Sequence, residues 1–156
     1  MKGIGVGILL VAFSAICFAQ KAPEGCYWGV DGWGLSHHAD RRKGYNEKNW
    51  GAGARGQCGN WFAAVDDMRN SVRGNTLSVG GGYEYPVFSI GDFTFSAEAE
   101  LTHLDYEVPG RGVARGFILL PGIEVRKGRW GGTVAYVPPG GRRESIFLLF
   151  GSYYFY

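Results

Sequence analysis

The sequence predicts an all-β fold, an eight-stranded antiparallel up-and-down transmembrane β-barrel, and three observations support this prediction. Eight segments show alternating or two-faced apolar character, each bounded by glycine, proline, asparagine or charged residues, as the strands of such barrels do. Glycine (27 residues) and aromatic residues (15%) are abundant, whereas leucine, isoleucine and methionine are too sparse for a helical core. The alternating lengths of the connections favour the barrel over its main alternative, a soluble β-sandwich with an aromatic core.

The first residues predict a signal peptide over residues 1–19. Lys2 supplies a positive charge, and residues 4–18 form an apolar run too short to span a bilayer as a helix. Small side chains at Cys17 and Ala19 indicate cleavage after Ala19. The barrel is therefore expected to occupy residues 20–156. No later stretch approaches the roughly 18 consecutive apolar residues of a transmembrane helix.

The predicted strands cover residues 27–38, 49–57, 60–70, 76–86, 93–103, 114–127, 129–138 and 145–156. Short turns follow the second, fourth and sixth strands. More charged connections, at 39–48, 71–75, 104–113 and 139–144, follow the others. Short turns on one side and longer loops on the other are typical of barrels in the bacterial outer membrane, with the long loops outside the cell. Four tryptophans near strand ends would form an interfacial girdle: Trp28, Trp50, Trp61 and Trp130.

Strand alternation predicts two halves of the lumen. Charged residues such as Arg55, Glu84, Glu124 and Arg126 fall toward the periplasmic ends and would fill the lower lumen, and so narrow a barrel disfavours an open pore. Apolar residues are expected to face the upper lumen, namely Ile118, Leu120, Val137, Phe147 and Leu149, whereas Ile146, Leu148, Phe150, Tyr154 and Tyr156 would face lipid. Alternation alone leaves two interpretations open: a pocket for a hydrocarbon chain, or simple mutual packing.

Prolines mark the pairing of strands six and seven. Pro121 lies inside the sixth strand, and Pro138 ends the seventh beside Pro139. Proline cannot donate a hydrogen bond to a neighbouring strand, so this seam should be weak. An unpaired seam in lipid is costly because no water satisfies its backbone groups. A lateral doorway for a lipid tail would explain Pro121, whereas Pro138 can also be explained by a strand end beyond the hydrocarbon layer.

The cysteine content and the net charge limit which bonds, cofactors and partners are expected. Cys26 and Cys58 remain after cleavage and would lie at the periplasmic ends of the first two strands, where a disulfide is possible but not required. The histidines and cysteines lack metal-ligand spacing, so no metal or other cofactor is expected. The net charge of +2 gives no reason to expect a nucleic-acid partner.

An ordered set of short motifs resembles the lipid A palmitoyltransferases, the PagP family. The residues that carry the resemblance are Tyr45-Asn46-Glu47 with Trp50-Gly51 and Gly53, then Gly59-Asn60-Trp61, Asn70-Ser71, Gly80 to Tyr83, Leu119 to Gly122, and Ala135 to Gly140. The resemblance implies an eight-stranded outer-membrane barrel, working as a monomer, that moves an acyl chain from a phospholipid to lipid A. It also implies that Pro121 and Pro138 form a lipid doorway.

The resemblance further implies catalytic positions. A histidine at the outer end of the first strand matches His38 better than His37, and the family's Asp-Ser pair corresponds to Asn70 and Ser71. Histidine is the usual general base near neutral pH, and serine and asparagine side chains can stabilise an oxyanion. The sequence departs from the family at Asn70, in its short segment before the first strand, and in glycines where prolines would mark a second doorway.

Two functions therefore remain open from the sequence. One is a lipid A acyltransferase that uses His38, Asn70 and Ser71. The other is a non-catalytic barrel of the same ancestry that binds lipid or lipopolysaccharide. The residue that separates them is Asn70, because losing an aspartate that orients the base can cost orders of magnitude in rate. If the chain is an enzyme, Asp at this position is expected to raise its activity.

Overall fold

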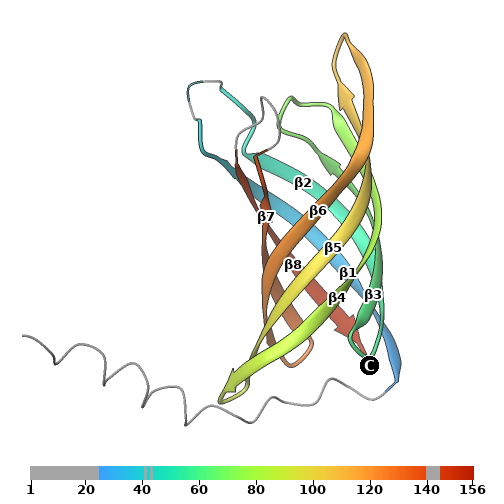
Figure 1. Ribbon diagram of the computed structural model, residues 1–156, viewed down its shortest axis with the longest axis vertical. Helices are drawn as coiled ribbons and strands as arrows, with labels where there is room; N and C mark the ends of the chain where they lie inside the picture. Colours follow the sequence, from blue (N-terminus) through green and yellow to red (C-terminus); the bar gives the residue numbers. More distant parts are fainter. Residues whose placement is uncertain (1–24, 41, 43, 140–144) are drawn as a thin grey trace, which may run out of the picture.

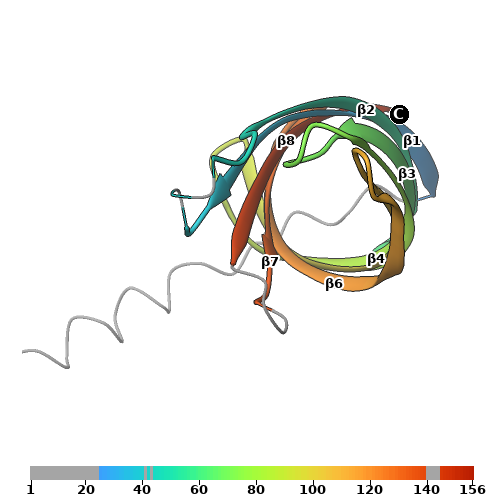
Figure 2. The same ribbon diagram turned by 90° about the horizontal axis from the view of Figure 1, so that it is seen from above.

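The computed structural model describes residues 25–40, 42, 44–139 and 145–156, and the predicted signal peptide lies outside the described residues. The described chain forms a closed antiparallel barrel in which each strand pairs with its neighbours in sequence and β1 closes onto β8 (Figures 1 and 2). The predicted fold class, an all-β, eight-stranded antiparallel up-and-down barrel, is confirmed. The strands are β1 (Cys26–His38), β2 (Lys48–Cys58), β3 (Trp61–Arg69), β4 (Asn75–Ile90), β5 (Phe93–Val108), β6 (Gly112–Lys127), β7 (Trp130–Val137) and β8 (Ile146–Phe155).

One end of the barrel, here called the turn end, carries three two-residue turns. Each turn begins with a glycine at positive φ, Gly59 (58°), Gly91 (57°) and Gly128 (55°), which a side chain would disfavour. The C-terminus lies at this end (Figure 1). The opposite end, here called the loop end, carries the connections 39–47, 70–74, 109–111 and 138–145.

The connection between β5 and β6 is shorter than the sequence predicts. Residues 104–113 were expected to form a loop, but β5 continues to Val108 and β6 begins at Gly112. The turn is closed by the Arg111 amide, which donates to the Val108 carbonyl at 2.9 Å. The charged residues in this stretch include Asp105 and Arg115, which are register partners and form a 3.2 Å ion pair. Their charge indicated a loop, yet they are compatible with a strand pair that extends the barrel wall (Figure 1).

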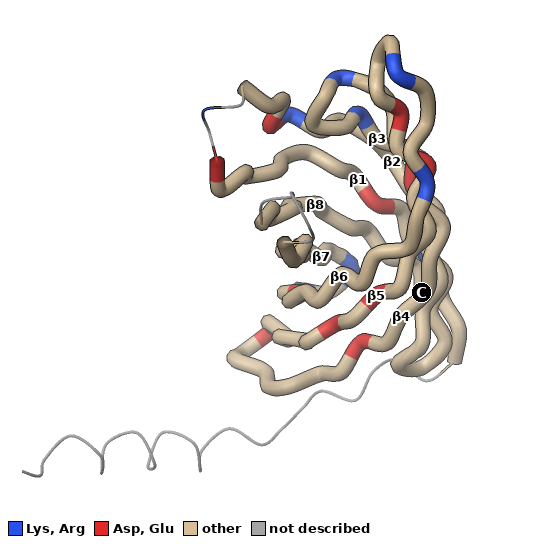
Figure 3. The backbone as a smooth tube through the Cα atoms, turned by 45° about the horizontal axis from the view of Figure 1, so that its top comes forward, with Lys and Arg blue, Asp and Glu red and all other residues tan. Residues whose placement is uncertain are grey.

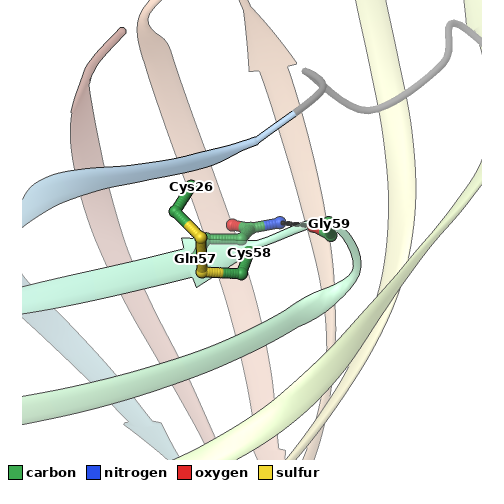
Figure 4. Close-up of a disulfide and its surroundings, with 4 residues drawn as sticks. All are labelled: Cys26, Gln57, Cys58 and Gly59. Atoms are coloured by element: carbon green, nitrogen blue, oxygen red, sulfur yellow. Dashed lines mark hydrogen bonds between the residues drawn. A yellow bond between two sulfur atoms is a disulfide. The ribbon is translucent and has the colours of Figure 1, made fainter.

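The two cysteines at the turn end form a disulfide. Cys26 and Cys58 are register partners in the β1–β2 ladder, with Cα atoms 4.1 Å apart. The Gln57 amide beside them donates to the Gly59 carbonyl at 3.2 Å (Figure 4). This bond ties the start of β1 to the end of β2, so the first strand of the described barrel is covalently anchored.

Charged and polar side chains fill the turn-end half of the lumen, and we call this set the polar plug: Tyr27, Arg55, Gln57, Glu84, Glu98, Glu124, Arg126 and Tyr154. Arg55 contacts Glu98 at 3.1 Å and Glu84 at 3.5 Å. Arg126 contacts Glu84 at 3.0 Å and Glu124 at 2.7 Å. The expectation that paired charges fill the lower lumen is confirmed. Buried charges of this kind require partners, because desolvation of an unpaired ion costs several kcal/mol.

The outer wall of the barrel exposes large apolar side chains. They alternate with inward-facing residues on β3 to β7 and include Val65, Leu77, Val79, Leu101, Leu119, Ile123 and Val134. Aromatic pairs lie at the turn end. Trp28 stacks on Phe155 with ring centroids 4.1 Å apart, and Trp130 contacts Tyr153 edge-on with ring centroids 4.8 Å apart. Among the described residues no helix is long and apolar enough to cross a bilayer.

Candidate functional site

A cavity of about 380 Å³ occupies the loop-end half of the lumen. Its volume lies within the range of ligand pockets. One part of the lining is apolar and comes from β3 and β5 to β8: Met68, Leu104, Ile118, Leu120, Val137, Ile146 and Leu148. Polar side chains also line the cavity and include Asn49, Asp66, Thr76, Ser78, Glu100 and Thr102. The cavity is thus amphipathic, less uniformly apolar than the sequence predicts.

The predicted inward faces hold for β6 and β7 but are wrong for β8. Ile118, Leu120 and Val137 line the cavity as expected. Phe147 and Leu149 instead lie on the outer wall, with exposed fractions of 48% and 45%, while Ile146 and Leu148 line the cavity in their place. Both faces of β8 are apolar or aromatic, so alternation of polarity does not indicate which face lies inside.

Two polar contacts set the face of β8. The Tyr154 hydroxyl donates to Glu124 at 2.7 Å inside the polar plug, and Ser152 donates to Asp31 at 2.5 Å. Phe150, on the same face, stacks on Trp33 with ring centroids 4.2 Å apart. The prediction that Tyr154 and Phe150 face lipid is therefore wrong, since buried polar partners outweigh the apolar character of these side chains.

His38 and Ser71 meet at the loop-end mouth of the cavity. The His38 Nε2 atom lies 2.7 Å from the Ser71 Oγ atom, and both residues line the cavity. His38 is the last residue of β1, and Ser71 lies in the turn between β3 and β4. The sequence-predicted pairing of these two side chains is what the geometry shows, and we call them the His–Ser dyad.

A bulge in β1 decides which of the two neighbouring histidines faces inward. The register with both adjacent strands shifts between Trp33 and Leu35. As a result Trp33 and His38 are both buried, whereas Leu35 is exposed. His37 points to the outside, where its Nδ1 lies 3.7 Å from Glu47. The preference for His38 over His37 agrees with this geometry.

Asn70 is engaged in the turn that carries Ser71. Its Nδ2 atom donates to the Glu107 carbonyl at 2.8 Å, to the Asn75 carbonyl at 3.0 Å and to Thr76 Oγ1 at 3.3 Å. Its Oδ1 atom accepts from the amides of Val72 and Gly74, at 3.1 and 2.9 Å. The side chain therefore shapes the 70–74 turn, which carries Ser71, through both of its polar atoms.

The two aspartates upstream in β3 also serve other purposes. Asp66 accepts from Trp33 Nε1 at 2.7 Å and from Ser78 Oγ at 3.3 Å, deep in the cavity. Asp67 is exposed on the outer wall. Sequence reasoning missed the contact between Trp33 and Asp66. Trp33 faces inward with Tyr27 and Asp31 before the bulge, and its apolar ring gave no sign that its Nε1 atom has a carboxylate partner.

Two tyrosines at the site were not assigned to it from the sequence. Tyr45 stacks on His38 with ring centroids 4.4 Å apart, and Tyr106 lines the cavity beside Ser71. Tyr45 lies in a segment that was singled out only for its resemblance to a known family. Tyr106 lies in the stretch that was predicted to be a loop.

The β6–β7 ladder is incomplete on the loop-end side. Paired residues run from Lys127 with Trp130 to Gly122 with Ala135, and no register partner in β7 continues the ladder from Pro121 onward among the described residues. The β5–β6 ladder, in contrast, continues to Gly112. The described β6–β7 ladder thus ends next to Pro121, whose neighbour Leu120 lines the cavity, and Pro138 follows the last residue of β7.

Comparisons of the sequence with protein-family models and with curated proteins gave no match. Among the described residues no group of three or more histidine, cysteine, aspartate or glutamate side chains is placed to hold a metal ion.

Proposed function

We propose that this protein is an outer-membrane enzyme that transfers a fatty acyl chain from a phospholipid to lipid A. The observation that carries the proposal is the 2.7 Å contact between His38 Nε2 and Ser71 Oγ at the mouth of a cavity with an apolar wall. A general base next to a hydroxyl, above a pocket for a hydrocarbon chain, is the arrangement that acyl transfer from a lipid requires. The resemblance to the PagP family supports the same assignment.

The outer wall supports a membrane location. Exposed apolar residues cover the strands, and exposed tryptophans lie near strand ends, with Trp28, Trp61 and Trp130 toward the turn end and Trp50 toward the loop end. A lipid-facing apolar band between two aromatic girdles is typical of outer-membrane barrels. The disulfide supports an oxidising compartment, since such bonds persist in the periplasm and at the cell surface.

The loop end supports contact with lipopolysaccharide. Many of the lysine and arginine positions gather toward this end, as Figure 3 shows, and the described ones include Arg42, Arg69, Arg73 and Arg111. Arginine binds phosphate through paired hydrogen bonds, and lipid A carries phosphates. These charges support the location and the acceptor class more than the chemical step.

In the proposed reaction, His38 takes the proton from a lipid A hydroxyl as that oxygen attacks the ester carbonyl carbon of the phospholipid. A new carbon–oxygen bond forms, and the carbonyl oxygen becomes an oxyanion, toward which the Ser71 hydroxyl donates. The old ester bond then breaks, and the departing lysophospholipid oxygen receives the proton from His38. The acyl chain occupies the cavity beside Ile118, Leu120 and Leu148. The open seam at Pro121 is the proposed entry for that chain.

Mass spectrometry of lipid A tests the proposal. Cells that express the protein, treated with a chelator to disturb outer-leaflet asymmetry, should gain lipid A heavier by one fatty acyl group. The His38→Ala and Ser71→Ala variants should lose that species, while His103→Gln, on the outer wall of β5, should keep it. Absence of the added acyl group in cells that contain folded wild-type barrel would reject the enzyme.

The second candidate is a non-catalytic barrel that binds lipid or lipopolysaccharide, and the contacts of Asn70 favour it. A side chain engaged by five partners in the turn does not act as the carboxylate of a catalytic triad. This candidate predicts lipid in the cavity of purified barrel but no change in lipid A. Native mass spectrometry of the barrel, run beside the lipid A assay, separates the two functions.

A further inference from the structure

The His–Ser dyad is assembled from two distant parts of the chain. His38 ends β1 and Ser71 lies in the β3–β4 turn, at a sequence separation of 33. Strand pairing does not place them directly, because β2 lies between β1 and β3 in the barrel. The 2.7 Å contact between His38 and Ser71 therefore needs a further segment that contacts both the end of β1 and the β3–β4 turn.

Residues 45–47, in the connection between β1 and β2, make that contact on both sides. Toward β1, the Glu47 carbonyl accepts from the Ser36 amide at 2.9 Å, and Glu47 Oε1 accepts from the His38 amide at 3.4 Å. Toward the β3–β4 turn, the Asn46 amide donates to the Ser71 carbonyl at 2.8 Å, and Asn46 Nδ2 donates to the Asn70 carbonyl at 3.3 Å. We call these three residues the bridge. The bridge fixes the backbones on which both dyad residues are carried.

Tyr45 extends the bridge to the imidazole itself. Its ring stacks on the His38 ring with centroids 4.4 Å apart and an interplanar angle of 30°. His38 is buried with an exposed fraction of only 2%, so its ring has few alternative orientations that keep this contact. Turning the imidazole out of its present plane would break the stack with Tyr45 and carry Nε2 away from Ser71. A half-turn about the second side-chain torsion keeps the ring plane but loses the contact between Nε2 and Ser71, so the stack and that contact together define the orientation.

We propose that Tyr45 is a positioning residue that holds the His38 ring in the orientation in which Nε2 faces Ser71, an inference that rests on the proposed acyl transfer. Ser–His–Asp sites orient the imidazole with a carboxylate. In this chain the residue beside Ser71 is Asn70, and it is used by the turn. The Tyr45 ring, which stacks on the imidazole, contributes to this orientation from the bridge.

The kinetic test compares two substitutions at Tyr45. Tyr45→Phe keeps the ring and should retain at least about half of kcat, whereas Tyr45→Leu removes the ring and should lower kcat about 10- to 100-fold with KM changed less than about twofold, since a misplaced base weakens only the chemical step. Tyr85→Leu, at an exposed tyrosine on the outer wall, is the matched control. Should Tyr45→Leu not fold, Tyr45→Met carries the same comparison.

A spectroscopic test is independent of turnover. Histidine labelled with nitrogen-15 in micelle-inserted barrel reports the ring nitrogen shifts of His38, assigned with His37→Gln and His103→Gln. Wild type and Tyr45→Phe should show the same fixed tautomer, and Tyr45→Leu should show averaging between tautomers. Equal spectra for all three, or a kcat of Tyr45→Phe as low as that of Tyr45→Leu, overturns the role of Tyr45. A shifted Tyr45→Leu spectrum from a barrel that transfers no acyl group upholds the positioning role and rejects the proposed function alone.

Discussion

At the scale of single residues, the site depends on which side chains the β1 bulge and the 70–74 turn direct inward. The bulge buries His38 and leaves His37 outside, and the turn places Ser71 within 2.7 Å of the buried imidazole. Neither effect involves the chemistry of the dyad. Small backbone irregularities therefore determine whether this barrel has a base and a hydroxyl in contact.

The first prediction concerns Asn70. Asn70→Asp replaces an amide that donates to two carbonyls and a hydroxyl by an oxygen that can only accept. The two carbonyls and the hydroxyl oxygen would lose their donor and face a carboxylate that repels them. The barrel should therefore be destabilised by about 1–3 kcal/mol, and acyl transfer should fall because Ser71 is displaced. Denaturant unfolding and the lipid A assay measure the two effects. An active, equally stable Asn70→Asp variant would show that the carboxylate reaches His38 and that the turn tolerates it.

The second prediction uses the two faces of β8. Leu148 lines the cavity and Leu149 lies on the outer wall. Leu148→Trp should shorten the space for the acyl chain, so transfer of the chain favoured by wild type should fall at least about tenfold and shorter chains should be preferred, because one methylene is worth roughly 1–3 kcal/mol in a tight pocket. Leu149→Trp should leave the chain length unchanged. The masses of lipid A from cells with each variant report the length of the transferred chain. A shorter chain with Leu149→Trp and an unchanged chain with Leu148→Trp would place Leu149 inside the lumen.

At the scale of elements, the sequence was sufficient to predict which face of a strand points inward where one face of that strand is polar. Arg55, Glu84 and Glu124 alternate with small or apolar residues, and their inward direction was predicted correctly. Prediction failed for β8, where Leu148 and Leu149 are chemically alike and distant partners in the plug decide the face. It failed again at residues 104–113, since charge on an outward strand face is indistinguishable in sequence from charge in a loop. The sequence left open whether Cys26 and Cys58 are bonded, because this depends on the register that makes them partners in the β1–β2 ladder.

The third prediction concerns the seam at β6. Residues 112–121 have ladder partners in β5, while the β6–β7 ladder ends at Gly122. Alternate amides of an antiparallel strand point to opposite neighbours, so every second amide in this stretch faces the opening. Hydrogen exchange by NMR should show these amides exchanging faster than those of residues 123–127 in the same strand. Uniform protection along β6 would mean that the seam is closed and that a donor lipid does not enter there.

At the scale of the whole molecule, the barrel is divided into two halves with different contents. The turn-end half holds Arg55 and Arg126 against three glutamates, and the loop-end half holds the cavity and the dyad. The plug closes the lumen on the turn-end side of the cavity, so the cavity has a defined floor. This division is what permits a ligand pocket in an eight-stranded barrel, whose interior is just wide enough for side chains to fill.

The fourth prediction tests that division. Arg126→Met removes the cation that contacts Glu84 and Glu124 and lies 4.0 Å from the Tyr154 ring. Removing one member of a buried ion pair typically costs about 3–5 kcal/mol, because the remaining charges stay buried without compensation. The unfolding free energy in lipid vesicles should fall by about that amount, and adding Glu124→Gln to the variant should recover part of it. Arg129→Met, at the turn beyond the plug, is the control and should change stability by less than about 1 kcal/mol.

Ion conductance completes the same test. The wild-type lumen is closed by paired side chains, so the wild-type barrel should carry no steady current in planar bilayers. That result would mean that the cavity is closed on the side of the plug. Loosening the plug by Arg126→Met should introduce water and brief conductance events before it affects the dyad, because His38 and Ser71 lie at the opposite end of the lumen. If instead Arg126→Met abolished acyl transfer with the barrel folded and the current unchanged, the two halves would be coupled and the plug would belong to the site.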